Sequence, residues 1–197
     1  MKRTAIAAAV LVVVSGGCAT MGGGGGRESL LDPQLSAFDR VGQANWRVED
    51  GAAVANRGVG YLVTKKDYGD FELRAEFWAD AGANSGIFLR CADRVKITAA
   101  NCYEVNIWDQ RPEPKYGTGA IVDVAAVNPM PKAGGRWNTY VITAKGDHLT
   151  VTLNGQRTVD VRHAKHARGP IVLQQAQGVV KDSGDAIKFR KLEVRPL

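Results

Sequence analysis

Side chains suited to binding a sugar and to moving a proton recur at every second position near the middle of the chain. Glu104, Asn106 and Trp108 alternate with apolar residues in one strand-like run, and Arg90 ends the run before it. Because successive side chains of a strand point to opposite faces of a sheet, pairing of the two runs would place all four on one face. A carboxylate, an amide, an indole and a guanidinium offer a proton acceptor, hydroxyl partners and a stacking surface. The sequence therefore predicts a carbohydrate-binding face here.

Each of these side chains also has a structural interpretation, which the sequence leaves open. Glu104 and Arg90 can form a cross-strand ion pair that takes no part in chemistry. Trp108 can belong to the core instead of stacking on a ligand. Asp109, the next residue, can cap the turn that ends the strand.

The elements that must position these residues are short strands joined by turns rich in glycine, asparagine and aspartate. Period-two alternation and turn signals such as Asn154-Gly155 predict about a dozen strands and no long amphipathic helix. This pattern favours an all-β fold, a sandwich of two antiparallel sheets. The expected strands cover residues 46–49, 52–55, 60–64, 70–78, 84–90, 103–108, 118–122, 137–144, 148–153, 156–161, 171–174 and 187–194.

Composition and charge narrow the class of protein. The chain has 197 residues with 45% hydrophobic and 23% charged residues, which is typical of one soluble globular domain. The net charge of +6 falls to 6 − 2 = +4 when the leader residues Lys2 and Arg3 are removed. No long basic run or basic helix is present, so the composition gives little support to nucleic-acid binding.

The N-terminus reads as a targeting segment. Lys2 and Arg3 precede an apolar stretch, residues 5–14, that is too short to span a bilayer. The following residues 15–18, Ser-Gly-Gly-Cys, resemble a bacterial lipobox in which the cysteine becomes the lipidated N-terminus. Ala19 stands where an aspartate would retain a lipoprotein in the inner membrane, so the outer membrane is the expected location.

A signal peptide over residues 1–17, a glycine-rich tether over 18–28 and one folded domain over 29–197 follow from this leader. The expected protein is an exported lipoprotein, attached to the membrane through lipid on Cys18. The alternative is an ordinary cleaved signal peptide with an incidental cysteine.

The other two cysteines, Cys91 and Cys102, stand at the end of one expected strand and the start of the next. An even pair in an exported protein predicts a disulfide. Closing a loop of this size stabilises the fold by about 3 kcal/mol in the chain-entropy model. Two free thiols acting as ligands or nucleophiles are the alternative.

Other ionisable residues have ordinary explanations. Glu72 and Glu76 share one face of the strand expected at 70–78, where cross-strand ion pairs are more usual than catalysis. His148, His163 and His166 lie in hairpin or loop contexts without metal-ligand spacing.

Several motifs in fixed order resemble those of the DUF1080 family, which is also named for 3-keto-disaccharide hydrolase, 3-keto-glucoside lyase and 3-keto-glucal hydratase activity. The likeness covers residues from about 46 to the C-terminus. It implies a concanavalin A-like lectin/glucanase jelly roll and, as in many relatives, export or lipid anchoring. The motifs are DYGDFELRAEFW, NSGIFLR, YEVNIWD, TGA, RWNTYVITAKGDHLTVTLNGQ, GPIVLQ and IKFRKLEVRPL.

The resemblance implies chemistry on a sugar oxidised at C3. The ketone acidifies the hydrogen on C2, a base removes that proton, the enolate expels the group on C1, and water adds to the product. Such a site needs a general base, a partner for the enolate oxygen and a proton donor for the leaving group. A divalent metal ion can serve as the partner of the enolate.

The implied roles fall on residues of the shared motifs. Glu104 would be the general base, Arg90 would stabilise the enolate or hold a hydroxyl, and Asp109 would bind hydroxyls or assist proton transfer. Where relatives carry a short acidic or His-Gly segment, residues 175–178 read Gln-Ala-Gln-Gly, so no metal ligand is assigned. The expected substrate-binding side chains are Asn106, Trp108, Gln174, Asn84 and Lys65.

Three functions remain open on the sequence alone. The leading expectation is an enzyme, a lyase or hydrolase acting on 3-keto-glycosides. A non-catalytic, lectin-like lipoprotein that binds carbohydrate is the alternative, because this fold hosts both roles. The third is a cell-envelope interaction protein with a vestigial sugar face.

Overall fold

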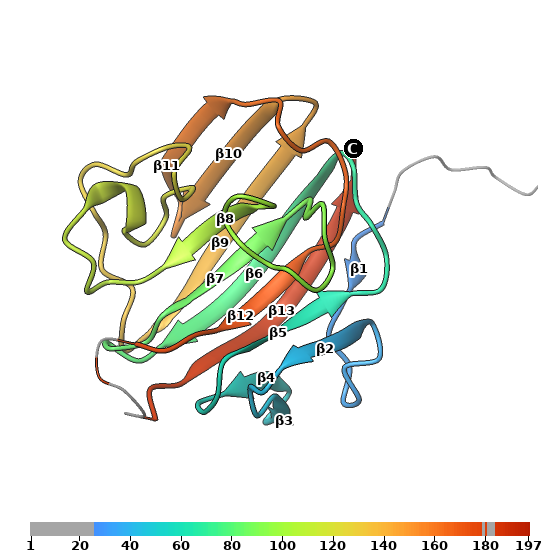
Figure 1. Cartoon of the computed structure of the whole chain (residues 1–197), viewed down its shortest axis with the longest axis vertical. Helices are drawn as coiled ribbons and strands as arrows, with labels where there is room; N and C mark the ends of the chain where they lie inside the picture. Colours follow the sequence, from blue (N-terminus) through green and yellow to red (C-terminus); the bar gives the residue numbers. More distant parts are fainter. Residues whose placement is uncertain (1–25, 179, 181–183) are drawn as a thin grey trace, which may run out of the picture.

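The computed structural model describes residues 26–178, 180 and 184–197. Two antiparallel β-sheets are stacked face to face, with the smaller sheet in front of the larger one in Figure 1. The larger sheet has the strand order β11-β10-β9-β6-β13-β4-β3, with β1 also pairing with β13, and the smaller sheet has the order β2-β5-β12-β7-β8. The strands are β1 (Glu28–Ser29), β2 (Phe38–Gly42), β3 (Arg47–Glu49), β4 (Ala52–Ala55), β5 (Gly60–Thr64), β6 (Phe71–Ala79), β7 (Ser85–Leu89), β8 (Tyr103–Ile107), β9 (Trp137–Lys145), β10 (His148–Leu153), β11 (Gln156–Arg162), β12 (Val172–Gln175) and β13 (Ile187–Pro196), and the short 3₁₀ helix η1 is Pro114–Tyr116.

This architecture confirms the predicted sandwich of two antiparallel sheets, with three differences in its elements. The two-residue strand β1 was not predicted. Strand β2 was not predicted, because its sequence combines one buried residue, Phe38, with charged and exposed neighbours. Residues 118–122 do not form the expected strand. Ile121 makes only isolated bridges there, since the backbone turns at Gly119 (φ 92°) and Asp123 (φ 58°).

The predicted signal peptide, the lipidation site Cys18 and most of the tether lie outside the described residues. Within the described ranges, no helix has the length and apolar character needed to cross a membrane.

Strand β6 shows how the sequence pattern builds the core. Its alternate residues, including Phe71 and Phe77, are fully buried between the sheets. On the opposite face Glu72 pairs with Arg27 and Arg195, which holds the pKa of its carboxyl below the ordinary value. The equivalent ion pairs of Glu76 with Arg190 and Lys191 lower its pKa in the same way. The prediction that this face is a solvated surface with cross-strand ion pairs is confirmed.

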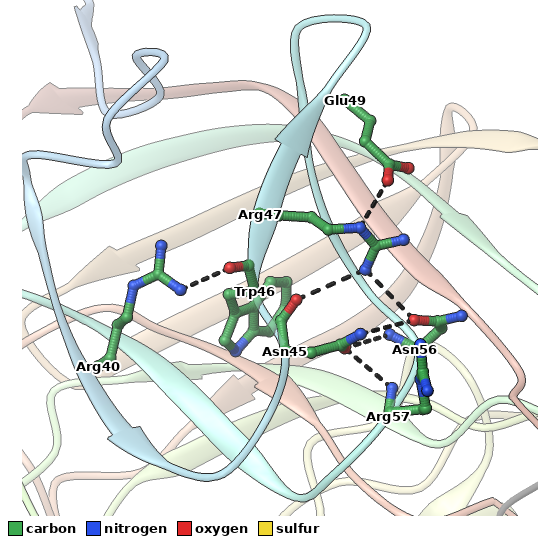
Figure 2. A network of polar contacts seen from close by, with 7 residues as sticks. All are labelled: Arg40, Asn45, Trp46, Arg47, Glu49, Asn56 and Arg57. Carbon is green, nitrogen blue, oxygen red and sulfur yellow. Dashed lines mark hydrogen bonds and ion pairs between the residues drawn. The ribbon is translucent and has the colours of Figure 1, made fainter.

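A network of polar contacts closes the β3–β4 hairpin at one edge of the larger sheet (Figure 2). The Asn45 Oδ1 atom accepts hydrogen bonds from the backbone N–H groups of Asn56 and Arg57, each at 3.0 Å. Asn45 Nδ2 donates to Asn56 Oδ1 at 2.9 Å, and Arg47 Nη1 donates to the same oxygen at 3.2 Å. These bonds hold the two ends of the β3–β4 hairpin together beside Trp46, which is buried in the core.

The loop between β7 and β8 covers part of the outer face of the smaller sheet. Cys91 and Cys102 form a disulfide across this loop. Both cysteines and Ile97 pack against residues of the sheet, among them Phe88 and Val172, in a small apolar cluster separate from the main core. The outer face is therefore apolar and covered in this region, and its polar groups gather on the remaining part, along β8 and at the ends of β7 and β12.

Candidate functional site

A cavity of about 280 Å³ opens on the uncovered part of the smaller sheet's outer face. Strand β8 contributes Glu104 and Asn106, whose even positions point outward while Tyr103, Val105 and Ile107 are buried in the core. The segment that follows β8, at the left of Figure 1, contributes Trp108, Arg111 and Tyr116 to the lining. The cavity is lined by Asn84, Glu104, Asn106, Trp108, Arg111, Tyr116, Val122 and Gln174.

Gly86 forms the floor of the site. It lies opposite Asn106 in the β7–β8 pair, and Phe88 lies opposite Glu104. A Cβ atom at position 86 would lie 3.3 Å from both Cγ and Oε1 of Glu104. The absence of a side chain at Gly86 thus leaves room for the glutamate.

Glu104 has the protonation behaviour of an acid–base group. Burial, and to a smaller extent the negative charge of Asp123, raise the pKa of its carboxyl to about 7. The same side chain is then present as carboxylate and as carboxylic acid near neutral pH, which suits proton transfer in both directions.

Four buried polar atoms of the cavity-lining side chains have no hydrogen-bond partner within the described part of the protein. One of them, Arg111 Nε, forms an ion pair with Glu113; the other three are Asn106 Oδ1, Gln174 Oε1 and Trp108 Nε1. Asn106 is held in place because its Nδ2 donates to the Tyr116 carbonyl. Leaving such a group unpaired costs about 1–3 kcal/mol each, so a ligand with several hydroxyl groups would recover this cost on binding. The two acceptors and one donor match the hydroxyls and carbonyl of a sugar.

Arg111 is the cation of the cavity, and the sequence did not identify it. Its guanidinium carbon lies 4.9 Å from the centre of the Trp108 ring and 4.5 Å from that of Tyr116, in cation–π contact with both. Its Nε atom also forms an ion pair with Glu113 Oε2 at 3.2 Å. The loop that carries Arg111 has no periodicity, so the only signal in the sequence was its position three residues after Trp108.

The expectation that Arg90 shares the face of Glu104 is wrong. The backbone of Arg90 has a φ of 51°, which ends the alternation of β7 and turns the side chain away from the cavity. The guanidinium is fully buried and donates to the carbonyls of Gly69 (2.8 Å), Gly146 (2.7 Å) and His166 (3.2 Å). It also pairs with Asp70 at 3.0 Å. Arg90 therefore joins three loops and contacts neither Glu104 nor the cavity.

Asp109 and Lys65 also lie outside the group that lines the cavity. The Asp109 Oδ1 atom accepts from the Thr118 hydroxyl at 2.6 Å, and Oδ2 accepts from the backbone N–H groups of Ala133 and Gly134 at 2.8 Å. Both oxygens thus anchor loops. Lys65 Nζ donates to the Ser36 carbonyl at 2.9 Å.

The structure does bring Glu104, Asn106, Trp108, Gln174 and Asn84 together around the cavity. Asn84 Nδ2 donates to the Gln177 carbonyl at 3.0 Å. The roles proposed for these residues stay predictions.

The donor set of the site does not fit a bound metal ion. Among the described residues, no three His, Cys, Asp or Glu side chains are grouped as metal ligands would be. Glu104 is the one carboxylate among the described residues that line the cavity. We therefore derive no step through a metal.

The fold and the cavity define a lectin-like jelly roll with a polar site on the outer face of its smaller sheet. Within that class, the chain belongs to the family described as the 3-keto-alpha-glucoside-1,2-lyase-like domain, which matches residues 26–195. The match confirms the resemblance to the DUF1080 family and gives the protein a carbohydrate-related function. A comparison with curated proteins found no match.

Solved structures support the fold. A protein from Parabacteroides distasonis ATCC 8503 proposed to be a glycosyl hydrolase has a TM-score of 0.73 at 24% identity, covering 87% of this chain and 100% of its own. A second such protein from the same strain has a TM-score of 0.73 at 16% identity, covering 87% and 94%. The carbohydrate-binding module CBM66 from Bacillus subtilis has a TM-score of 0.60 at 14% identity, covering 81% and 95%.

Proposed function

We propose that the protein cleaves 3-keto-glycosides by elimination followed by hydration, with Glu104 as the base. The observation that carries this proposal is a carboxyl group with a raised pKa in a cavity where Asn106 Oδ1, Gln174 Oε1 and Trp108 Nε1 lack partners among the described residues. Family membership supports the substrate class. In the first step the Glu104 carboxylate takes the proton from C2, and the electron pair of the C–H bond becomes the C2–C3 enolate.

Arg111 takes the role that the family resemblance implied for Arg90. The Arg111 guanidinium is held by cation–π contact with two aromatic rings, so it can bind the enolate oxygen on C3 without moving. Donors that are already in place when charge develops are what stabilises a transition state most. The indole N–H of Trp108 is a second donor.

The enolate then expels the group on C1, which forms the C1–C2 double bond and breaks the bond to the leaving oxygen. Protonated Glu104 holds the proton that the leaving oxygen needs, so the elimination neither consumes nor releases protons overall. Addition of water places hydroxyl on C1 and hydrogen on C2 and yields the free 3-keto sugar.

The test is turnover of a 3-keto-glucoside by the unmodified protein and by Glu104→Gln, with binding measured by calorimetry. We expect the variant to bind the sugar but to lose turnover. Glu49→Gln, on an exposed strand of the other sheet, is the matched control and should retain full activity. Binding without turnover by the unmodified protein would refute the lyase and leave a carbohydrate-binding module.

We also propose that the protein acts as an outer-membrane lipoprotein anchored through Cys18, on the strength of the lipobox-like sequence. Labelled fatty acid should be incorporated into the unmodified protein and not into Cys18→Ala. A variant that still fractionates with the membrane and carries label would contradict this.

A further inference from the structure

A second cavity, of about 240 Å³, lies next to the first along the same strand. Val122 lines both cavities. Cys102, which lines the second one, precedes Glu104 by two residues and belongs to the apolar cluster on the outer face of the sheet. The second cavity is lined by Ala99, Ala100, Cys102, Tyr103, Val122, Asp123, Val124, His163 and Lys165.

The wall between the two cavities is fixed to β8. The Val122 N–H donates to the Glu104 carbonyl at 3.0 Å, and the Asn106 N–H donates to the Ala120 carbonyl at 3.0 Å. The segment around Val122 therefore runs beside β8, and Glu104 lies where the two cavities adjoin. For a glycoside whose sugar occupies the first cavity, the second cavity is therefore the neighbouring site for its C1 substituent.

The far side of the second cavity is also held firmly. The Tyr103 hydroxyl donates to the His163 carbonyl at 2.7 Å and accepts from the His166 N–H at 3.0 Å. The loop after β11 is thus pinned to the start of β8, so the cavity has a defined shape.

The lining of the second cavity is more suited to an aromatic ring than to a second sugar. Five of its nine residues are alanine, valine or disulfide-bonded cysteine. Of the polar side chains, Asp123 is bound by Lys115 and by the Tyr116 hydroxyl, each at 3.3 Å, and His163 Nδ1 lies 3.2 Å from the Tyr103 hydroxyl. Lys165 is the other charged side chain of the lining, so this cavity offers fewer partners to the hydroxyls of a sugar than the first cavity does. An apolar cavity of about 150 Å³ is large enough to bind benzene, so this larger cavity, with its mixed lining, has room for a single ring.

The chemistry of the first cavity also favours an aromatic leaving group. Glu104 is the one carboxyl group among the described residues lining the first cavity, so this single group has to take the C2 proton and to supply the proton of the leaving oxygen. A phenol, whose pKa is about 10, leaves as its anion far more readily than an alcohol and depends less on a proton donor.

We propose that this second cavity binds the leaving group of 3-keto-glycosides and selects aglycones with one aromatic ring. The proposal rests on the proposed function. The step it concerns is the departure of the C1 substituent, in which the C1–O bond breaks and the electron pair goes to the phenolic oxygen.

The test compares phenyl and methyl 3-keto-glucosides in the unmodified protein and in Ala100→Trp. Ala100 is exposed at the rim, so an indole there fills the cavity without entering the core. We expect kcat/KM for the phenyl glycoside to fall by about tenfold or more, the range that one lost pocket contact produces, while that for the methyl glycoside stays within about twofold. Ala92→Trp, at an exposed position of the same loop that does not line the cavity, is the matched control.

Equal losses on both substrates, or none on either, would overturn the proposal. Failure of the proposed function would look different, because the unmodified protein would then turn over neither glycoside. The cavity is tested in that case by NMR of the valine methyl groups. Addition of 4-nitrophenol should shift the signals of Val122 and Val124 in the unmodified protein and not in Ala100→Trp. The absence of shifts in the unmodified protein would refute the binding of an aromatic ring in the second cavity.

Discussion

Replacing Glu104 by glutamine should stabilise the protein while it abolishes turnover. The carboxyl has a pKa of about 7 in the folded protein, against an ordinary value of 4.5. Each unit of difference corresponds to about 1.4 kcal/mol, so the buried carboxylate costs the folded state about 3 kcal/mol at pH values above 7. Glutamine has nearly the same shape and carries no charge, so it avoids this cost.

The raised pKa of Glu104 determines how the free energy of unfolding changes with pH. Below pH 4.5 the carboxyl is protonated in both the folded and the unfolded chain, and it contributes nothing to the difference in stability. Between 4.5 and 7 the folded chain retains a proton that the unfolded chain has lost, so stability decreases as the pH rises. Above 7 the full cost is present.

Urea unfolding of the unmodified protein and of Glu104→Gln at pH 4 and pH 8 measures this difference directly. We expect nearly equal free energies of unfolding at pH 4 and a more stable variant, by about 2–3 kcal/mol, at pH 8. Groups with lowered pKa, such as Glu72 and Glu76, are present in both proteins and cancel in the comparison. A variant that is equally stable or less stable at pH 8 would show that Glu104 is not buried as a costly carboxylate, and the argument for its role as a base would fail.

Three further outcomes are expected. The kcat/KM for a 3-keto-glucoside should rise with pH through a midpoint near 7 as Glu104 ionises. Asp123→Asn should move that midpoint to lower pH because a negative charge near Glu104 is removed. An unchanged midpoint would contradict the effect of Asp123 on the pKa of Glu104. Arg111→Met should lower kcat/KM by about 10²-fold with little change in melting temperature, since its ion pair with Glu113 is partly exposed; equal activity would exclude it as the partner of the enolate. Arg90→Met should instead reduce the free energy of unfolding, measured in urea, by about 3–5 kcal/mol, because the carbonyls of Gly69, Gly146 and His166 lose their donor. It should leave the pH midpoint of activity unchanged.

The strand pattern predicted the two sheets and the outward direction of Glu104 and Asn106. These properties depend on local alternation, which the sequence contains in full. Arg90 shows the limit of that reasoning, because a single residue with positive φ reverses the direction of a side chain at the end of a strand. An arginine in that position carries no local sign of such a conformation.

Arg111 and the second cavity depend on how loops pack, and no periodic pattern describes loops. Arg111 reaches the site because residues 108–116 fold back over the end of β8, where Asn106 Nδ2 bonds to the Tyr116 carbonyl. Asp109 was predicted for chemistry because it follows the motif strand, but its two oxygens hold Thr118 and the loop at residues 133–134. Contacts between distant segments decided both cases.

Gly86 offers a simple marker within the family. Its φ is not in the left-handed region, so the local conformation would accept alanine, but a Cβ atom would lie 3.2 Å from the Val105 carbonyl oxygen and 3.3 Å from the Glu104 side chain. Even a methyl group at this position would reduce the depth of the cavity and press on the carboxylate. Relatives that carry a larger residue opposite the asparagine of the site should therefore have a displaced or replaced glutamate, and this one position would distinguish members able to remove a proton from those that can only hold a sugar.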